Sequence, residues 1–235
     1  VNLMGYTHYW YRRKTVAPRT YSKIVRDFRC LLPVLEEWGI RLAGGLGEGE
    51  PRIDEDEVWF NGDRNCGHRR DEAIAIAWPA KDGHGVAAPG EDVKAGSWFA
   101  GAMLSKRSCD GDCSHETFHF PRVLKPHDWE KPDGGLYFSF CKTAFKSYDL
   151  AVTAFLVIAK HYLRGRLRVH SDGDEAQWQD ARWLCELELG YGLDFQLARW
   201  LAGRGHEVHL LGCLPVPPRH DLGEFNAIRL HLPAV

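Results

Sequence analysis

The stretch SYDLAVTAFLVIAKHYLRG, residues 147–165, predicts the most deeply buried helix of this chain. Its apolar side chains cover nearly every face of a 3.6-residue repeat, whereas a surface helix keeps a polar face. Gly165 is expected to end it, because glycine readily adopts the left-handed conformation that closes helices. A helix that is apolar all round must be covered by other elements, so the fold has to be built around this segment.

The neighbouring segments supply covering elements. RLRVHS has strand composition, and DGDEAQWQDARWLCELELG has the period of an amphipathic helix with acidic residues in its first turn. Near the start of the chain, GYTHYWYRR predicts a strand. An apolar stripe over residues 20–39 then predicts a second long helix, which Pro33 should kink.

Residues 40–124 contain short segments with strand composition, divided by loops rich in Gly, Asp and Asn. These segments are IRLA, EVWFNG, EAIAIAWP, SWFAGAML and ETFHFPRV. We therefore expect one α+β domain over residues 1–192, with a mixed, largely antiparallel sheet and helices mainly on one face. Residues 193–235 are expected to form a C-terminal extension packed on or beside this domain.

Composition limits the class of protein. The chain has 235 residues, 44% of them hydrophobic, and a net charge of −2, which predicts a packed core and gives no global signature of a nucleic-acid binder. The start has no signal-peptide pattern, and the longest apolar run, residues 150–159, is too short to cross a bilayer. We therefore expect a cytoplasmic protein without membrane contact, whose seven cysteines are thiols or metal ligands.

The stretch HETFH has the spacing of a zinc-peptidase helix, with His115 and His119 as ligands and Glu116 as the base. That site requires a helix, because only there do residues four apart face the same way. The aromatic neighbours and Pro121 instead predict a strand over residues 116–123, in which residues four apart are separated by about 13 Å. A zinc-dependent hydrolase is therefore the lowest-ranked function.

Cysteine and histidine also occur together in two loops of the same region. Cys109, Cys113 and His115 lie in a loop rich in Gly and Asp, and Cys66 and His68 lie in another loop. Thiolates and imidazoles from two loops are the usual parts of a closed structural zinc site. We expect a structural zinc here, with the first three residues as the better-supported ligands. The alternative is that these are unconnected loop residues.

The segment FCKTAFKSYD, at the start of the buried helix, predicts an anion site. Lys142 and Lys146 flank a helix N-terminus, where free N–H groups and the helix dipole attract phosphate or carboxylate, and Ser147 adds a hydroxyl donor. His8 and Asp172 are the polar groups that we expect beside this ligand site. The alternatives are a solvated helix start, a packed histidine and an aspartate that caps the next helix.

Several motifs resemble a family of uncharacterised proteins from phages, prophages and actinobacterial genomes. They are GYTHYW, VWFNG, HETFHFPR, FCKTAFKSYDLAV and SDGD with a following LGYG. The resemblance covers roughly residues 4–192. It implies no particular activity and assigns no catalytic residues.

These observations predict a cytoplasmic accessory protein of phage or mobile-element type that binds a phosphate-bearing ligand, a nucleotide or nucleic acid. The rival is a protein-interaction module that inhibits a host factor, with zinc only holding the loops together. Whether the protein is an enzyme is left open. Convergence of His8, Lys142, Lys146 and Asp172 in one pocket would favour the ligand site, and their dispersal would favour the interaction module.

Overall fold

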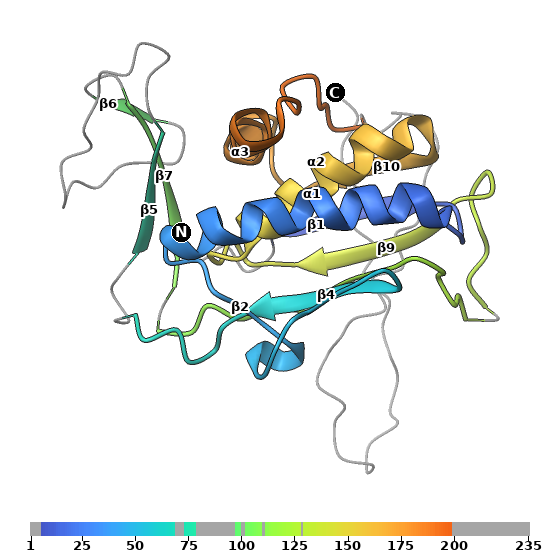
Figure 1. The fold of residues 1–235 in the computed structure, drawn as a ribbon, viewed down its shortest axis with the longest axis horizontal. Coiled ribbons are helices and arrows are strands. Elements are labelled where there is room, and N and C mark those ends of the chain that lie inside the picture. The colour runs from blue at the N-terminus through green and yellow to red at the C-terminus, as the bar shows by residue number, and fades with distance from the viewer. Residues whose placement is uncertain are drawn as a thin grey trace, which may run out of the picture. The chain divides into compact units, whose positions relative to one another are not determined.

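The computed structural model describes residues 6–68, 73–78, 97–99, 102–109, 111–127 and 129–198, with the backbone alone at 73–78, 97–99, 102–106 and 108. Helices and antiparallel sheets make up this part of the chain, so the expected α+β class is confirmed (Figure 1). The described strands form three separate sheets, and all of their pairings are antiparallel. Most of the expected C-terminal extension, from residue 199 onward, lies outside the described residues.

Helix α2 (Asp149–Leu163) is the buried helix that the sequence predicts. Every residue from 149 to 159 is buried, because α1 (Pro18–Glu37) packs on one side and α3 (Gln179–Leu189) on another. Figure 1 shows these helices on one side of strands β9 and β4. Within the described residues, none of the helices has both the length and the apolar character needed to cross a membrane.

Helix α1 begins two residues before the expected start. Pro18 occupies its first position, where the missing N–H costs nothing, and Pro33 lies inside the helix as expected. Its buried face is the apolar stripe seen in the sequence. This face consists of Tyr21, Ile24, Val25, Phe28, Leu31 and Leu35, together with Asp27.

The first sheet has the strand order β10 (Leu167–Ser171), β1 (Thr7–Arg12) and β9 (Tyr137–Lys142). In its register, His8 lies opposite Ser171 on one neighbour and opposite Cys141 on the other. Strand β9 was not expected from the sequence. Its residues, YFSFCK, have the aromatic composition of a strand, but FCKTAFKSYD was interpreted only as an anion site before the buried helix. Because β9 leads into α2 and β10 leads toward α3, the chain segments before these two helices lie on either side of His8.

The second sheet is built around β4 (Glu57–Gly62), which pairs with β8 (Phe118–Pro121) along one edge. Short strands β2 (Leu42–Ala43) and β3 (Arg52–Ile53) also pair with β4, at different residues. Its inner face carries aromatic rings, and the ring of Phe118 lies 5.1 Å from that of Phe155 on α2. These contacts fix the second sheet against the central helix.

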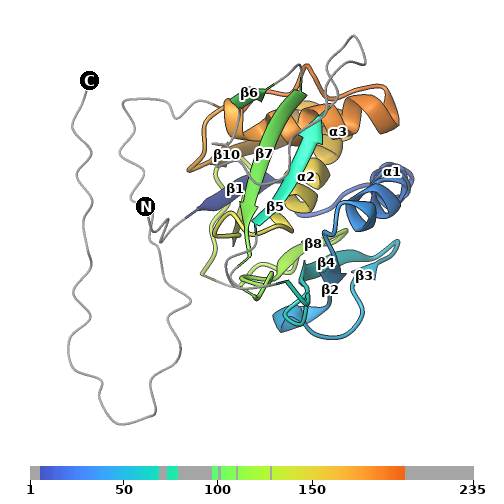
Figure 2. The same ribbon diagram turned by 90° about the vertical axis from the view of Figure 1, so that its left-hand side faces the viewer.

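The third sheet has β7 (Ala102–Ser108) between β5 (Ala73–Trp78) and β6 (Ser97–Phe99) (Figure 2). The sequence predicted a single strand over SWFAGAML, whereas this segment contributes to both β6 and β7. Strand β7 ends at Ser108, directly before Cys109. One half of the candidate metal centre is therefore attached to this sheet.

Candidate metal centre

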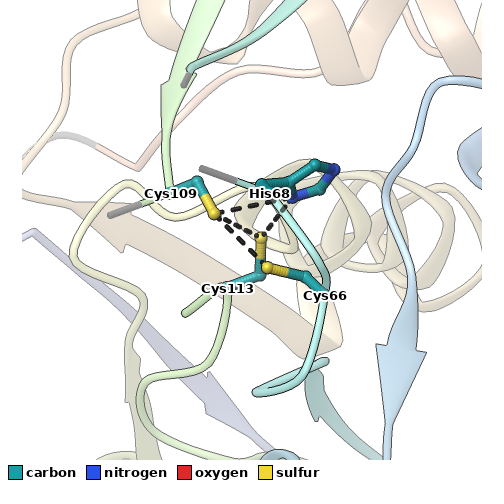
Figure 3. Close-up of side chains that lie close together, drawn as sticks. All are labelled: Cys66, His68, Cys109 and Cys113. Atoms are coloured by element: carbon teal, nitrogen blue, oxygen red, sulfur yellow. Dashed lines mark hydrogen bonds between the residues drawn. The ribbon is translucent and has the colours of Figure 1, made fainter. Parts of the chain in front are cut away.

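Four side chains with metal-binding groups lie together between two loops (Figure 3). They are Cys66, His68, Cys109 and Cys113, and their donor atoms all lie within 4.8 Å of one another. The Cys109 sulfur lies 3.4 Å from that of Cys66 and 3.3 Å from that of Cys113. Nδ1 of His68 lies 3.5 Å from the Cys109 sulfur and 3.4 Å from the Cys113 sulfur. This cluster can hold a metal ion.

The spacing of the sulfur atoms fits a shared ion and does not fit a disulfide. A disulfide requires about 2.05 Å between two sulfur atoms, and the cysteines of this cluster are all free thiols. Four donors around a tetrahedral zinc, at about 2.3 Å for sulfur, would place the sulfur atoms about 3.8 Å apart. The observed separations need only a small expansion to reach that geometry.

Each ligand pair contains a glycine whose backbone is left-handed. Gly67, between Cys66 and His68, has φ +78°, and Gly111, between Cys109 and Cys113, has φ +75°. A side chain at either position would strain the backbone, because L residues rarely adopt this conformation. Both loops therefore turn tightly enough to aim two donors at one point.

A close approach of two backbones brings the loops together. Gly62 ends β4, and a Cβ atom added there would lie 1.9 Å from the carbonyl oxygen of Cys113. The N–H of Cys113 also donates to the carbonyl of Asp63 over 3.2 Å. The side-chain amide of Asn61 donates to the carbonyl of His115 and its oxygen accepts the N–H of that residue, at 2.9 and 3.0 Å. These contacts within the protein therefore hold the two loops together without the help of an ion.

The three thiols of the cluster are shielded from water, whereas His68 is half-buried. Cys109 and Cys113 are 1% exposed and Cys66 is 6% exposed. Burial raises the pKa of the Cys109 thiol and, more strongly, that of the Cys113 thiol, because a dry environment disfavours the thiolate. A divalent cation would supply the positive charge that stabilises thiolates in such a place.

The side chain of Lys146 contacts the loop that carries two cysteines of the cluster. Its ammonium group donates to the carbonyl oxygens of Cys109 and Asp112, at 2.6 and 2.8 Å. Ser147, the expected hydroxyl donor beside it, is fully buried. These two bonds of Lys146 are directed at the backbone of the ligand loop, and an anion site at the start of α2 stays a prediction.

His8 and Asp172, also expected at the ligand site, each have partners different from those of Lys146. His8 is 0% exposed and its Nε2 lies 2.7 Å from Oδ1 of Asp149. The exposed carboxylate of Asp172 accepts hydrogen bonds from the N–H of Thr7 and the hydroxyl of Tyr9, both at 3.0 Å. The order of elements expected from the sequence suggested that these groups lie close together. It does not show which partner each side chain has in the folded protein.

The HETFH stretch does not form a peptidase site. Strand β8 pairs with β4, so Phe118 and Phe120 are buried whereas His119 between them is exposed. Nε2 of His119 lies 2.9 Å from Oε2 of Glu57, and Nδ1 of His115 lies 2.8 Å from the carbonyl oxygen of Lys142. His115 therefore lies outside the metal cluster, in which His68 is the only imidazole.

A buried polar network lies where three of the sequence motifs meet. His8 comes from GYTHYW, Asp149 from CKTAFKSYD and Ser171 from HSDGD. Nδ1 of His8 lies 3.0 Å from the hydroxyl of Ser171, and the hydroxyl of Thr143 donates to Asp149 over 2.5 Å. Arg107 lies 3.7 Å from the second oxygen of Asp149. Burial alone would raise the pKa of Asp149, but these partners together hold it below its usual value.

This network has the order of a Ser–His–Asp triad without its geometry. In serine hydrolases the serine faces Nε2 and the aspartate faces Nδ1, whereas Ser171 and Asp149 exchange these positions around His8. The imidazole is also fully buried, so a substrate cannot reach it in this arrangement. The geometry therefore favours a structural network that links β1, α2 and β10.

Comparisons of the chain with protein-family models, with curated proteins and with solved structures give no match. The resemblance to a phage and actinobacterial family therefore stays a prediction. The functional assignment rests on the geometry of the site.

In the sequence His115 is closer than His68 to Cys113, and this proximity favours His115 as a ligand. Cys66 and Cys109 are 43 positions apart, and spacing alone does not show that their loops meet. One local signal favoured His68, which is the glycine between it and Cys66. The same sign, a glycine inside the pair, marks the segment from Cys109 to Cys113.

Proposed function

We propose that this chain is a zinc-binding protein and that its zinc is structural. The observation that carries the proposal is the convergence of three thiols and one imidazole within 4.8 Å. Soft sulfur donors with imidazole are the usual ligands of zinc, whereas calcium and magnesium prefer oxygen. Four protein donors fill a tetrahedral shell, so no position is left for a substrate or a catalytic water.

The ion would join parts of the fold that are distant in the chain. Cys66 and His68 follow β4 of the second sheet, and Cys109 and Cys113 follow β7 of the third. Through Lys146, the same loop is connected to the start of α2. Because such a site does not exist in the unfolded chain, zinc binding contributes directly to folding.

The proposal is tested by measuring the metal content of protein purified without added zinc. We expect one zinc per chain by native mass spectrometry, and we expect Cys113→Ser to lose it. Cys30→Ser is the matched control, because Cys30 is exposed and lies outside the cluster. Folded wild-type protein without zinc, or Cys113→Ser protein that keeps a full equivalent, would contradict the proposal.

The other functions that the sequence leaves open receive different support. Strand β8 gives no support to a hydrolase built on HETFH, which needs a helix there. The bonds of Lys146 to the metal loop weaken the support for a phosphate site at the start of α2. A protein-interaction module stays a prediction. It agrees with the separate partners that His8, Asp172 and Lys146 have in the structure.

A further inference from the structure

A small cavity opens where β1 ends, α1 begins and α2 ends. Its polar lining consists of Arg12, Arg13 and Arg166 with the threonines Thr15 and Thr20. The space measures about 20 Å³, enough for one water-sized atom such as a phosphate oxygen. Three arginines and no acidic residue line it, so the composition of the lining is that of an anion site.

Arg12 is a buried cation without an acidic partner among the described residues. It is 1% exposed, and its two terminal nitrogens donate only to the carbonyls of Arg13 and Pro121, at 3.2 and 2.5 Å. Its guanidinium lies 4.3 Å above the ring of Phe120, and its Nε has no hydrogen-bond partner in the described part of the chain. Burial lowers the pKa of Arg12 to about 10, so it is still charged at neutral pH. A buried charge without a counter-ion is costly, and an anion would relieve that cost.

The surroundings of the cavity are basic. Residues 12–20 and 160–168 contain no Asp or Glu, and each of these stretches contains four Lys or Arg. Among the described carboxylates, only that of Asp133 forms an ion pair with a basic residue of these two stretches. Its Oδ2 lies 4.0 Å from a terminal nitrogen of Arg168. Helix α1 starts here with no side-chain cap and no acidic residue in its first turn, so the positive end of its dipole is not compensated.

We propose that this cavity binds a phosphate group, with one oxygen directed toward Arg12 and the others facing Arg13 and Arg166. Phosphate fits better than carboxylate because it offers an oxygen to each of three guanidinium groups. The exposed residues Lys14 and Arg164 flank the lining residues in the chain and extend the positive surface beyond the cavity. The phosphate comes from a small phosphorylated molecule or from a nucleic acid, and the proposal does not depend on the zinc site.

The test compares two double variants of the full chain. Arg13→Gln/Arg166→Gln removes the two exposed arginines of the cavity and keeps the buried Arg12, so the fold is preserved. Arg29→Gln/Arg41→Gln is the matched control, because it removes the same charge from exposed positions outside the cavity. Inorganic phosphate is titrated by calorimetry and a labelled DNA duplex by fluorescence anisotropy, and circular dichroism confirms that both variants are folded.

We expect the wild type and the control to bind, and we expect the cavity variant to bind about tenfold more weakly or worse. Equal affinity for free phosphate and DNA would identify a small phosphorylated ligand. Much tighter binding of DNA would identify a nucleic acid. In that case the slope of the logarithm of the DNA-binding constant against the logarithm of salt concentration should become shallower by about 1 for each arginine removed. If the wild type binds neither probe, or if the cavity variant binds as well as the control, the proposal is wrong.

Discussion

The ammonium nitrogen of Lys146 lies 2.6 Å from the carbonyl oxygen of Cys109, so the start of α2 holds the loop that carries two of the four metal ligands. The same ammonium group donates a second hydrogen bond of 2.8 Å to the carbonyl of Asp112, which lies in that loop between the two cysteines. The most buried helix of the chain and its candidate metal centre are therefore mechanically connected. This relationship gives the lysine a structural role that can be measured.

Replacing Lys146 with methionine should destabilise the protein by about 2 kcal/mol, because two charge-assisted hydrogen bonds to partly buried carbonyls are lost. Zinc should also be released faster to a chelator. Lys142→Met is the matched control, since in the described structure it is the backbone of Lys142 that bonds to Glu116 and His115. Equal unfolding free energies and release rates for the two variants would show that the Lys146 contact has no effect.

Gly62→Ala should disrupt the metal centre. The added methyl group would lie 1.9 Å from the Cys113 carbonyl, so one of the two loops must move. We expect a loss of roughly 3 kcal/mol in the free energy of unfolding, together with weaker zinc binding. Gly165→Ala is the control, because a Cβ there meets no atom within 4 Å. Denaturant titration and metal analysis would show whether the two variants differ.

The histidines provide a direct check on the choice of ligand. His68→Ala should lose zinc, whereas His115→Ala and His119→Ala should keep one equivalent, because these two imidazoles bond to Lys142 and Glu57 and not to the cluster. The measurement is zinc content per chain after gel filtration. Zinc loss in His115→Ala with retention in His68→Ala would restore the ligand set that the sequence favoured.

Asp149→Ala should be among the most destabilising single substitutions, by about 3–5 kcal/mol. The reason is that it leaves Nε2 of His8 and the hydroxyl of Thr143 buried without their carboxylate partner, and Arg107 keeps only its ion pair with Asp180 among the described residues. Asp194→Ala, at an exposed position, should change stability by less than about 0.5 kcal/mol. A serine-reactive fluorophosphonate should not label the protein. Labelling that disappears in Ser171→Ala would instead assign a catalytic role to the network.

Stability should fall in acid through two buried aspartates. Burial would raise the pKa of Asp27, but hydrogen bonds from Tyr162, Tyr191 and Arg26 hold it below its ordinary value of 3.8, and the pKa of Asp149 is also depressed. A carboxyl group with a depressed native pKa contributes stability that is fully present above its unfolded pKa. That stability is lost as the pH falls from about 3.8 through the native value. Asp27→Asn should flatten this acid limb in urea titrations at several pH values, and an unchanged pH slope would contradict the expectation.

The sequence by itself determined the elements whose pattern is local. The all-apolar run of α2, the striped face of α1 and the strand composition of β1, β4, β8 and β10 each come from the spacing of side chains along one segment. Pro121 and its aromatic neighbours were also enough to predict a strand in place of a peptidase helix. The residue types of the metal centre were visible for the same reason, since cysteine and histidine in Gly-rich loops suggest ligands whatever their partners.

Only the tertiary structure decided which of these groups meet. His68 and not His115 joins the thiols because β4 and β7 deliver their loops to the same place, and β8 turns His115 toward Lys142. The sequence predicts that Lys146 attracts a ligand anion, whereas in the fold its ammonium group donates hydrogen bonds to two backbone carbonyls. In the sequence Arg12 is an ordinary strand residue, and only the fold brings the distant Arg166 to the cavity that Arg12 and Arg13 also line. Periodicity fixes the face on which a residue lies, whereas long-range packing fixes its partner, and function depends on the partner.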